Sequence, residues 1–173
     1  MTTKLPPPGA ASPDDHTEIS RQFLQHAKEE LARDSRLQAS EKTWGAMAHA
    51  LKAIAQERGW RHRGHYYILD IGAQIASEYS ISSIVSATHR AYNLHQNFYD
   101  SNDDVVVIGR TIDIVDAVLP ELERIRSAEP RPFTIRQGFE RNRLRQITGI
   151  KTLQVGDTSP VGFSQTLPPA PEV

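Results

Sequence analysis

Arg90 and His95 are the two residues of this 173-residue chain whose types and spacing best suit chemistry on a phosphodiester. A guanidinium can hold a phosphate through two parallel hydrogen bonds, and a histidine with an ordinary pKa can move a proton near neutral pH. Together they could cleave RNA without a metal ion. On a straight helix, however, five residues separate their Cβ directions by about 140°, so they converge only if the helix bends or a symmetric dimer joins two copies.

A purely structural interpretation of the same two residues stays open. Arg90 could pair with an acidic side chain. His95 lies beside Leu94 and Phe98 on an apolar stripe, so it could be a hydrogen-bonded histidine of the core. The spacing by itself therefore leaves a catalytic and a structural hypothesis for the pair.

Glu41 is the first residue expected to support the pair. It falls between Leu37 and Trp44 on a stripe that we expect to be buried, and a buried carboxylate needs a partner. It could orient Arg90 or His95, or it could form a structural ion pair with a lysine or arginine. The other supporting candidates lie on the predicted helix of the pair: Asn93, Asn97 and Tyr99.

A second arginine and histidine, Arg58 and His65, have six residues between them. Because Gly59 and Gly64 favour a loop there, we interpret this stretch as an exposed basic connector. His62 and His65 could suggest a metal site, but the chain has no cysteine and no nearby carboxylate that would complete a zinc ligand set. We therefore expect neither a metal nor another cofactor.

The chain becomes basic towards its C-terminal end. Residues 130–151 contain six Lys or Arg and one Glu, whereas residues 1–129 contain 14 Lys or Arg and 18 Asp or Glu. Phe133, Ile135 and Phe139 are interleaved with these cations, a composition that suits RNA backbone and stacked bases. It equally suits docking on the acidic part of the same chain or of a partner. The arginines that could bind nucleic acid or a partner are Arg136, Arg141, Arg143 and Arg145.

The composition excludes several classes of protein. Without cysteine there can be no disulfide framework and no thiol catalysis. No apolar run approaches the roughly 20 residues that cross a bilayer, and the first residues lack the apolar core of a signal peptide. We therefore expect a soluble, cytoplasmic protein. The sequence also lacks a Walker phosphate loop, a Rossmann glycine fingerprint and a serine nucleophile elbow.

Helices must position the candidate residues, because apolar residues recur at steps of three and four along most of the chain. Ser12 and Pro13 are typical of a helix start, and Gly59 of a helix end. Four residues alone, 105–108, could form a strand, but their apolar face continues for five helical turns. The five predicted helices span about residues 13–34, 37–58, 65–79, 81–100 and 105–125.

Five helices with one apolar stripe each predict an all-α, up-and-down antiparallel bundle. The second helix should be central, because an additional stripe of alanines, including Ala46 and Ala50, would let another helix approach closely. We expect residues 1–12 to form a flexible arm and residues 13–128 to form the bundle. Residues 129–173 should be a basic, proline-containing and mostly irregular tail, in which a short helix around residues 137–146 can form.

Two segments resemble a known family. ASEKTWGA at residues 39–46 and LHQNFYD at residues 94–100 are similar to the PaREP-type branch of the HEPN superfamily, small helical-bundle proteins of archaea and bacteria. The resemblance covers about residues 19–125. It implies a two-fold homodimer. It also implies metal-independent endoribonuclease activity where the motif is Arg, four to six residues, then His. Arg90 and His95 match that motif, although active members usually carry a polar residue where Ala91 stands.

The resemblance leaves two hypotheses about function. In the first, the protein is a dimeric module that binds RNA or a partner in a toxin–antitoxin, defence or stress-response system. In the second, it is an active endoribonuclease that uses Arg90 and His95. In either case the partner could be a small nucleotidyltransferase-like or antitoxin protein.

Overall fold

A computed structural model describes residues 11–96 and 104–159 of the chain, and two of the predicted supporting residues, Asn97 and Tyr99, lie outside them. The predicted all-α fold is confirmed, with six helices and two very short strands among the described residues. The elements are α1 (Pro13–Ala32), α2 (Arg36–Glu57), α3 (His65–Tyr79), α4 (Ser82–Gln96), α5 (Val105–Ser127), β1 (Phe133–Thr134), α6 (Gly138–Thr148) and β2 (Thr158–Ser159).

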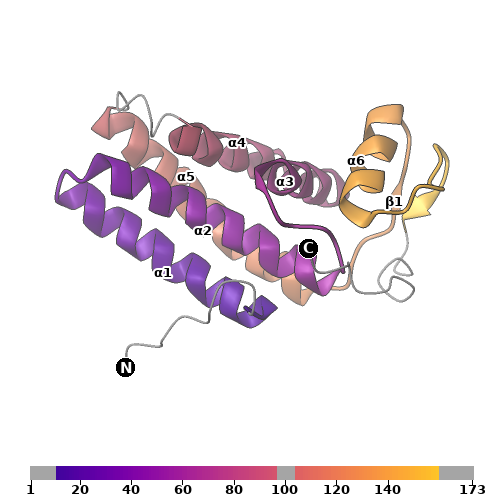
Figure 1. Cartoon of the computed structure of the whole chain (residues 1–173), viewed down its shortest axis with the longest axis horizontal. Helices are drawn as coiled ribbons and strands as arrows, with labels where there is room; N and C mark the ends of the chain where they lie inside the picture. Colours follow the sequence, from indigo (N-terminus) through magenta and orange to yellow (C-terminus); the bar gives the residue numbers. More distant parts are fainter. Residues whose placement is uncertain (1–10, 97–103, 160–173) are drawn as a thin grey trace.

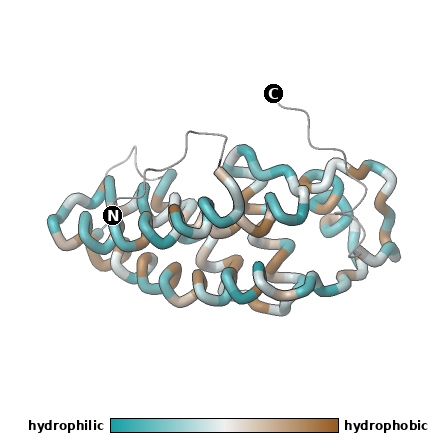
Figure 2. The backbone as a smooth tube through the Cα atoms, turned by 90° about the horizontal axis from the view of Figure 1, so that it is seen from below, coloured by the Kyte–Doolittle hydropathy of each residue, from teal (hydrophilic) through white to brown (hydrophobic). Residues whose placement is uncertain are grey.

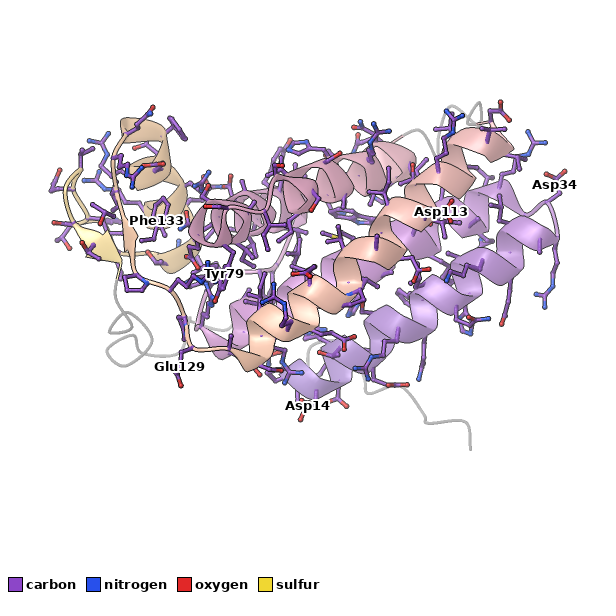
Figure 3. The ribbon with its side chains drawn as sticks, turned by 180° about the vertical axis from the view of Figure 1, so that it is seen from behind. Asp14, Asp34, Tyr79, Asp113, Glu129 and Phe133 are labelled. Atoms are coloured by element: carbon purple, nitrogen blue, oxygen red, sulfur yellow. The ribbon has the colours of Figure 1, made fainter. Side chains whose placement is uncertain are left out.

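The first five helices form the bundle. Helices α1 and α2 make one antiparallel hairpin and α3 and α4 another, while α5 packs against α1, α2 and α4 (Figure 1). Hydrophobic and hydrophilic residues alternate along the helices (Figure 2), as expected when each helix buries one side. Figure 3 labels Asp34, in the α1–α2 turn, at one end of the molecule and Phe133 at the other.

Helix α2 lies at the centre of this packing, as its alanine stripe predicts. Ala46 and Ala50 are buried, and the Ser20 hydroxyl of α1 donates to the Ala46 carbonyl at 2.7 Å. A Cβ atom at Gly45 would lie only 2.3 Å from the ring of Phe23, so glycine permits this close approach of α1. Leu37, expected on the buried face, is instead 41% exposed, because it lies in the first turn of α2 at the end of the bundle.

The ends of the helices follow local sequence signals. The Ser12 hydroxyl accepts from the backbone N–H of Asp15 at 3.1 Å, and the Asp15 carboxylate accepts from the backbone N–H of Ser12, which makes a capping box. Gly59 follows α2 with φ of +67°, a conformation that costs glycine little. Asp104 caps α5, which is a helix and not a strand, and Pro120 does not end it early.

The segment after the bundle has more structure than the mostly irregular tail that we predicted. Helix α6 covers residues 138–148, two residues longer than expected at its C-terminal end, and β1 pairs with β2 in an antiparallel bridge. Ile135, Leu144, Ile147 and Leu153 are buried against the core, so these residues hold the segment on the bundle. Because these apolar residues follow no long periodic pattern, the sequence gives little sign of this packing.

Polar contacts also attach α6 to α3. Arg143 donates to the Gln74 side-chain oxygen at 3.0 Å and to the Ser77 hydroxyl at 3.2 Å. Gln74 in turn donates to Glu78, whose carboxylate binds Arg58 at 2.5 Å in a largely buried ion pair. Arg58, which we expected on an exposed connector, therefore anchors the end of α2 to α3. Within the described residues, no helix is long and apolar enough to cross a membrane.

Candidate functional site

His95, near the end of α4, is held by Glu41 of α2. The imidazole Nδ1 lies 2.7 Å from the Glu41 carboxylate, and the two side chains are 19% and 33% exposed. Since a carboxylate only accepts, Nδ1 carries the hydrogen, and in the neutral imidazole Nε2 is left as the acceptor. The contact therefore fixes His95 in the tautomer that a proton-accepting residue needs. Among the alternatives left open for Glu41, the structure supports the orientation of His95.

Aromatic rings surround this contact at the junction of α2, α3 and α4. His95 stacks on Trp44, with ring centroids 5.8 Å apart and an interplanar angle of 22°. The ring centroid of Tyr92, one turn earlier on α4, lies 5.4 Å from that of Trp44. Trp44 is buried, whereas Tyr92 is half-buried and His95 reaches solvent. The rings thus hold His95 in a fixed orientation at the edge of the bundle.

His65 is a further ring beside His95, although its sequence context suggested an exposed connector. It is the first residue of α3, and its ring lies edge-on to His95 with centroids 4.6 Å apart. Burial lowers the pKa of His65, the nearby His95 and Lys52 lower it further, and Glu41 opposes them. We call His65 and His95 the surface histidine pair. Sequence reasoning missed this pairing because 29 residues and a helical hairpin separate the two.

Arg90 does not share the contacts of His95. Its Nε donates to Ser86 on the same helix at 3.4 Å, and its side chain is exposed. Asn93 is also exposed, on the solvent side of α4. Within the described residues, the structure thus joins Glu41 to His95 and leaves Arg90 and Asn93 at the surface nearby, as the angle of about 140° on a straight helix implies.

The four arginines nominated for binding divide into two kinds. Arg143 docks α6 on α3, and Arg145 donates to the Leu153 carbonyl at 2.9 Å, so both are used within the chain. Burial lowers the pKa of the Arg143 guanidinium. Arg141 contacts the adjacent Asn142, and Arg136 is exposed. For Arg143 and Arg145 the structure favours docking on the same chain, one of the two alternatives left open by the composition.

A second collection of histidines comes from α1, α2 and the connector between α2 and α3. His16 and His49 share a hydrogen bond of 2.8 Å between their Nδ1 atoms, and His62 lies 6.3 Å from His16 between ring centroids. Burial lowers the pKa of His16 and of His49 to about 4, and the charge of Lys52 adds to the effect. Burial also lowers the pKa of His62. We call His16, His49 and His62 the inner histidine group.

The inner histidine group suits a structural role. A bond between two Nδ1 atoms needs one donor and one acceptor, so the two rings cannot both be protonated. His16 is 8% exposed, which leaves little access for a ligand. Within residues 11–96 and 104–159, no group of three or more His, Asp or Glu side chains is arranged to hold a metal ion. The surface histidine pair, with its carboxylate, is therefore the better candidate for chemistry.

A comparison with protein families gives a match over more than half of the chain. The model of the archaeal PaREP1/PaREP8 family matches residues 15–117, which contain most of α1, all of α2 to α4 and about the first half of α5. The matched region includes Glu41, His65 and His95, and it excludes α6. Among curated proteins and among solved structures, none matches the chain significantly.

Proposed function

Because this chain belongs to the archaeal PaREP1/PaREP8 family, whose residues here resemble the HEPN superfamily, we propose that it is a helical RNA-binding module. It acts as a homodimer in a toxin–antitoxin, defence or stress-response system, with a small nucleotidyltransferase-like or antitoxin protein as its partner. The observation that carries the proposal is the gathering of rings at the junction of α2, α3 and α4.

Exposed side chains of α3 and α4 support this proposal, because they can contact single-stranded RNA. Tyr66, next to His65 in the chain, is 75% exposed and offers a ring on which a base can stack. Arg90 is exposed on α4 and can contact a phosphate, and Asn93 can donate and accept hydrogen bonds from the same helix. Aromatic stacking with a few cations is the usual basis of sequence-tolerant RNA binding.

Binding is tested with a fluorescently labelled, fully 2′-O-methylated oligonucleotide, which binds but cannot be cleaved at the ribose. Since stacking on one ring contributes about 1–3 kcal/mol per base, Tyr66→Ala should weaken binding by roughly 5- to 150-fold. The control is Val155→Ala, which removes an apolar side chain that is 49% exposed and lies outside the basic segment of residues 130–151. Absence of binding at low salt, or equal loss in both variants, would contradict the proposal.

The proposed homodimer is tested separately, by the molecular mass in solution. Light scattering on the full chain at micromolar concentration should give twice the mass of 19.4 kDa. A monomer under these conditions rejects a stable dimer and leaves RNA binding to be judged by the oligonucleotide experiment.

A second candidate function is metal-independent cleavage of the bound RNA, and the Glu41–His95 contact favours it. The contact leaves Nε2 of His95 ready to take the proton of a ribose 2′-hydroxyl. Because Arg90 and His95 of one copy point apart, Arg90 of the second copy in a symmetric dimer would stabilise the charge that develops on the phosphate. Cleavage should produce a 2′,3′-cyclic phosphate and should be unaffected by a chelator.

A further inference from the structure

His65 supplies a second imidazole beside His95, and it comes from a different helix. Its ring lies 4.6 Å from that of His95 and 5.6 Å from that of Trp44, edge-on to both. His65 is exposed and His95 is partly exposed. Two imidazoles are therefore held against one another where a substrate from solvent can reach both.

The two imidazoles have different partners. Glu41 binds Nδ1 of His95 at 2.7 Å and leaves its Nε2 as a proton acceptor. His65 instead contacts the rings of Trp44, Tyr92 and His95. Cleavage of RNA needs two proton transfers, one from the attacking 2′-hydroxyl and one to the departing oxygen. A pair in which one imidazole has a carboxylate partner and the other has none among the described residues fits this division into a base and an acid.

We propose that His65 is a catalytic residue that protonates the leaving oxygen while His95 acts as the base. This inference rests on the cleavage function proposed above. Nε2 of His95 takes the 2′-hydroxyl proton, O2′ bonds to the adjacent phosphorus, and the bond from phosphorus to O5′ breaks. The electron pair stays on O5′, which takes a proton from the His65 imidazolium. The products are a 2′,3′-cyclic phosphate and a 5′-hydroxyl, and exchange with water restores both histidines.

The charged surroundings of His65 set the pH range of this step. Lys52 from α2 and His95 from α4 disfavour its imidazolium form, and Glu41 from α2 favours it. Because burial and these cations together lower the pKa of His65, its protonated form is lost at a lower pH than that of an ordinary histidine. Cleavage should therefore follow a bell-shaped pH profile whose alkaline limb belongs to His65. His65→Ala should remove that limb.

Two substrates separate the roles of the two histidines. One is a short RNA, whose leaving alkoxide needs a proton. The other is a uridine 3′-(4-nitrophenyl phosphate), whose leaving phenolate does not. His65→Ala should slow cleavage of RNA by about 10²- to 10⁴-fold and cleavage of the nitrophenyl ester by less than about tenfold. His95→Ala should slow both by about 10²- to 10⁴-fold, because both reactions need the base.

Controls distinguish this role from a structural one. His89→Ala removes an exposed histidine from the same helix as His95 and should leave both reactions unchanged. His65→Gln keeps a polar side chain of similar length at the start of α3, so loss of RNA cleavage in this variant with unchanged melting temperature excludes unfolding as the cause. His95→Ala purified in parallel reports any contaminating nuclease.

The outcomes are distinguishable. If the wild-type protein cleaves RNA and both His65 variants cleave it equally well, His65 is not the acid and the cleavage function stands. Equal losses on both substrates in the His65 variants would also overturn its assignment as the acid. If the wild-type protein cleaves neither substrate, the cleavage function and this inference both fail.

Discussion

The surface histidine pair and the inner histidine group contain five of the seven histidines of the chain, yet they have opposite surroundings. In the surface pair, a carboxylate lies 2.7 Å from His95 and both rings reach solvent. In the inner group, His16 and His49 bind one another, and burial holds the pKa of each at about 4. The same residue type thus lies beside a carboxylate near solvent at one place and is held neutral by burial at the other.

This difference shows that the neighbours of a histidine in the sequence do not identify it as a candidate for catalysis. His16 and His49 are separated by 33 positions and His65 and His95 by 30, so each pair is made by packing. What divides them is the Glu41 carboxylate beside His95 in one group and the burial of His16 and His49 in the other. Substitutions of single residues in each group test this difference.

The largest contrast concerns RNA cleavage by His95→Ala and His49→Ala. Loss of an acid–base catalyst slows a reaction by about 10²- to 10⁴-fold, so His95→Ala should be nearly inactive with a melting temperature close to that of the wild type. His49→Ala should cleave normally but should be less stable by about 1–3 kcal/mol, because it removes a hydrogen-bonded and partly buried ring. Initial rates and thermal melts on the same preparations test both. The proposed difference between the two groups is wrong if His49→Ala loses RNA cleavage and His95→Ala loses only stability.

Glu41→Gln should have the next largest effect. An amide of the same shape no longer fixes the His95 tautomer, so kcat should fall while KM stays nearly constant. The fall should be at least about tenfold and at most the 10⁴-fold seen when the orienting carboxylate of a Ser-His-Asp triad becomes an amide. Glu57→Gln is the control, because Glu57 binds Arg126 at 2.8 Å and lies in the last turn of α2. A change in KM alone would indicate that Glu41 only contacts the substrate.

The inner histidine group should make stability depend on pH. The unfolded chain binds protons at His16 and His49 with a pKa near 6.5, whereas the folded chain binds them near pH 4. The unfolded state therefore gains protons first as the pH falls. This contribution to the free energy of unfolding is full above pH 6.5 and decreases as the pH falls to 4, by an amount on the order of 3 kcal/mol for each of the two rings.

Urea unfolding at pH 7 and at pH 4.5 measures this decrease. His49→Gln should remove about half of it, since one of the two titrating rings is gone and the other keeps a polar neighbour. His89→Gln, at an exposed position of α4, should leave it unchanged. If the free energy of unfolding depends equally on pH in the wild type and in His49→Gln, groups other than His49 cause that dependence.

Lys52→Met should have the smallest effect and should act on both groups at once. The positive charge of Lys52 lowers the pKa of His16, His49, His62 and His65. Without that charge each pKa should rise, by a few tenths of a unit when the charge is several ångströms away in a partly solvated site. Proton NMR titration of the imidazole signals gives the four values. A rise confined to one group would show that Lys52 does not couple them.

Local patterns in the sequence predicted most of the bundle. The apolar residues at steps of three and four predicted five helices at nearly their observed positions, and Ser12 and Gly59 predicted a helix start and a helix end. The short range of these signals explains the success, because each depends on residues within one or two turns. The same property explains why Leu37 was placed in the core. Periodicity locates a side of a helix, but not the point at which the neighbouring helices end.

The tail and the connector could not be predicted in this way. Leu144 and Ile147 are buried because α6 lies on α3. The Arg58 side chain is largely buried because Glu78 on a different helix binds it. Neither contact leaves a pattern in the local sequence. Composition was therefore a poor guide to Arg143 and Arg145, whose charge suggested a binding surface and whose hydrogen bonds attach the tail to the rest of the chain.

The helices, their caps and the need of Glu41 and His95 for a partner could be predicted from local sequence patterns. The tertiary structure alone decided that they are partners of one another, that Arg90 lies apart and that His65 joins them. The physical reason is that helical periodicity fixes only the direction of a side chain around its own axis. The packing of α2, α3 and α4 then decides which of these directions meet, and it does so through core residues that carry no chemistry themselves.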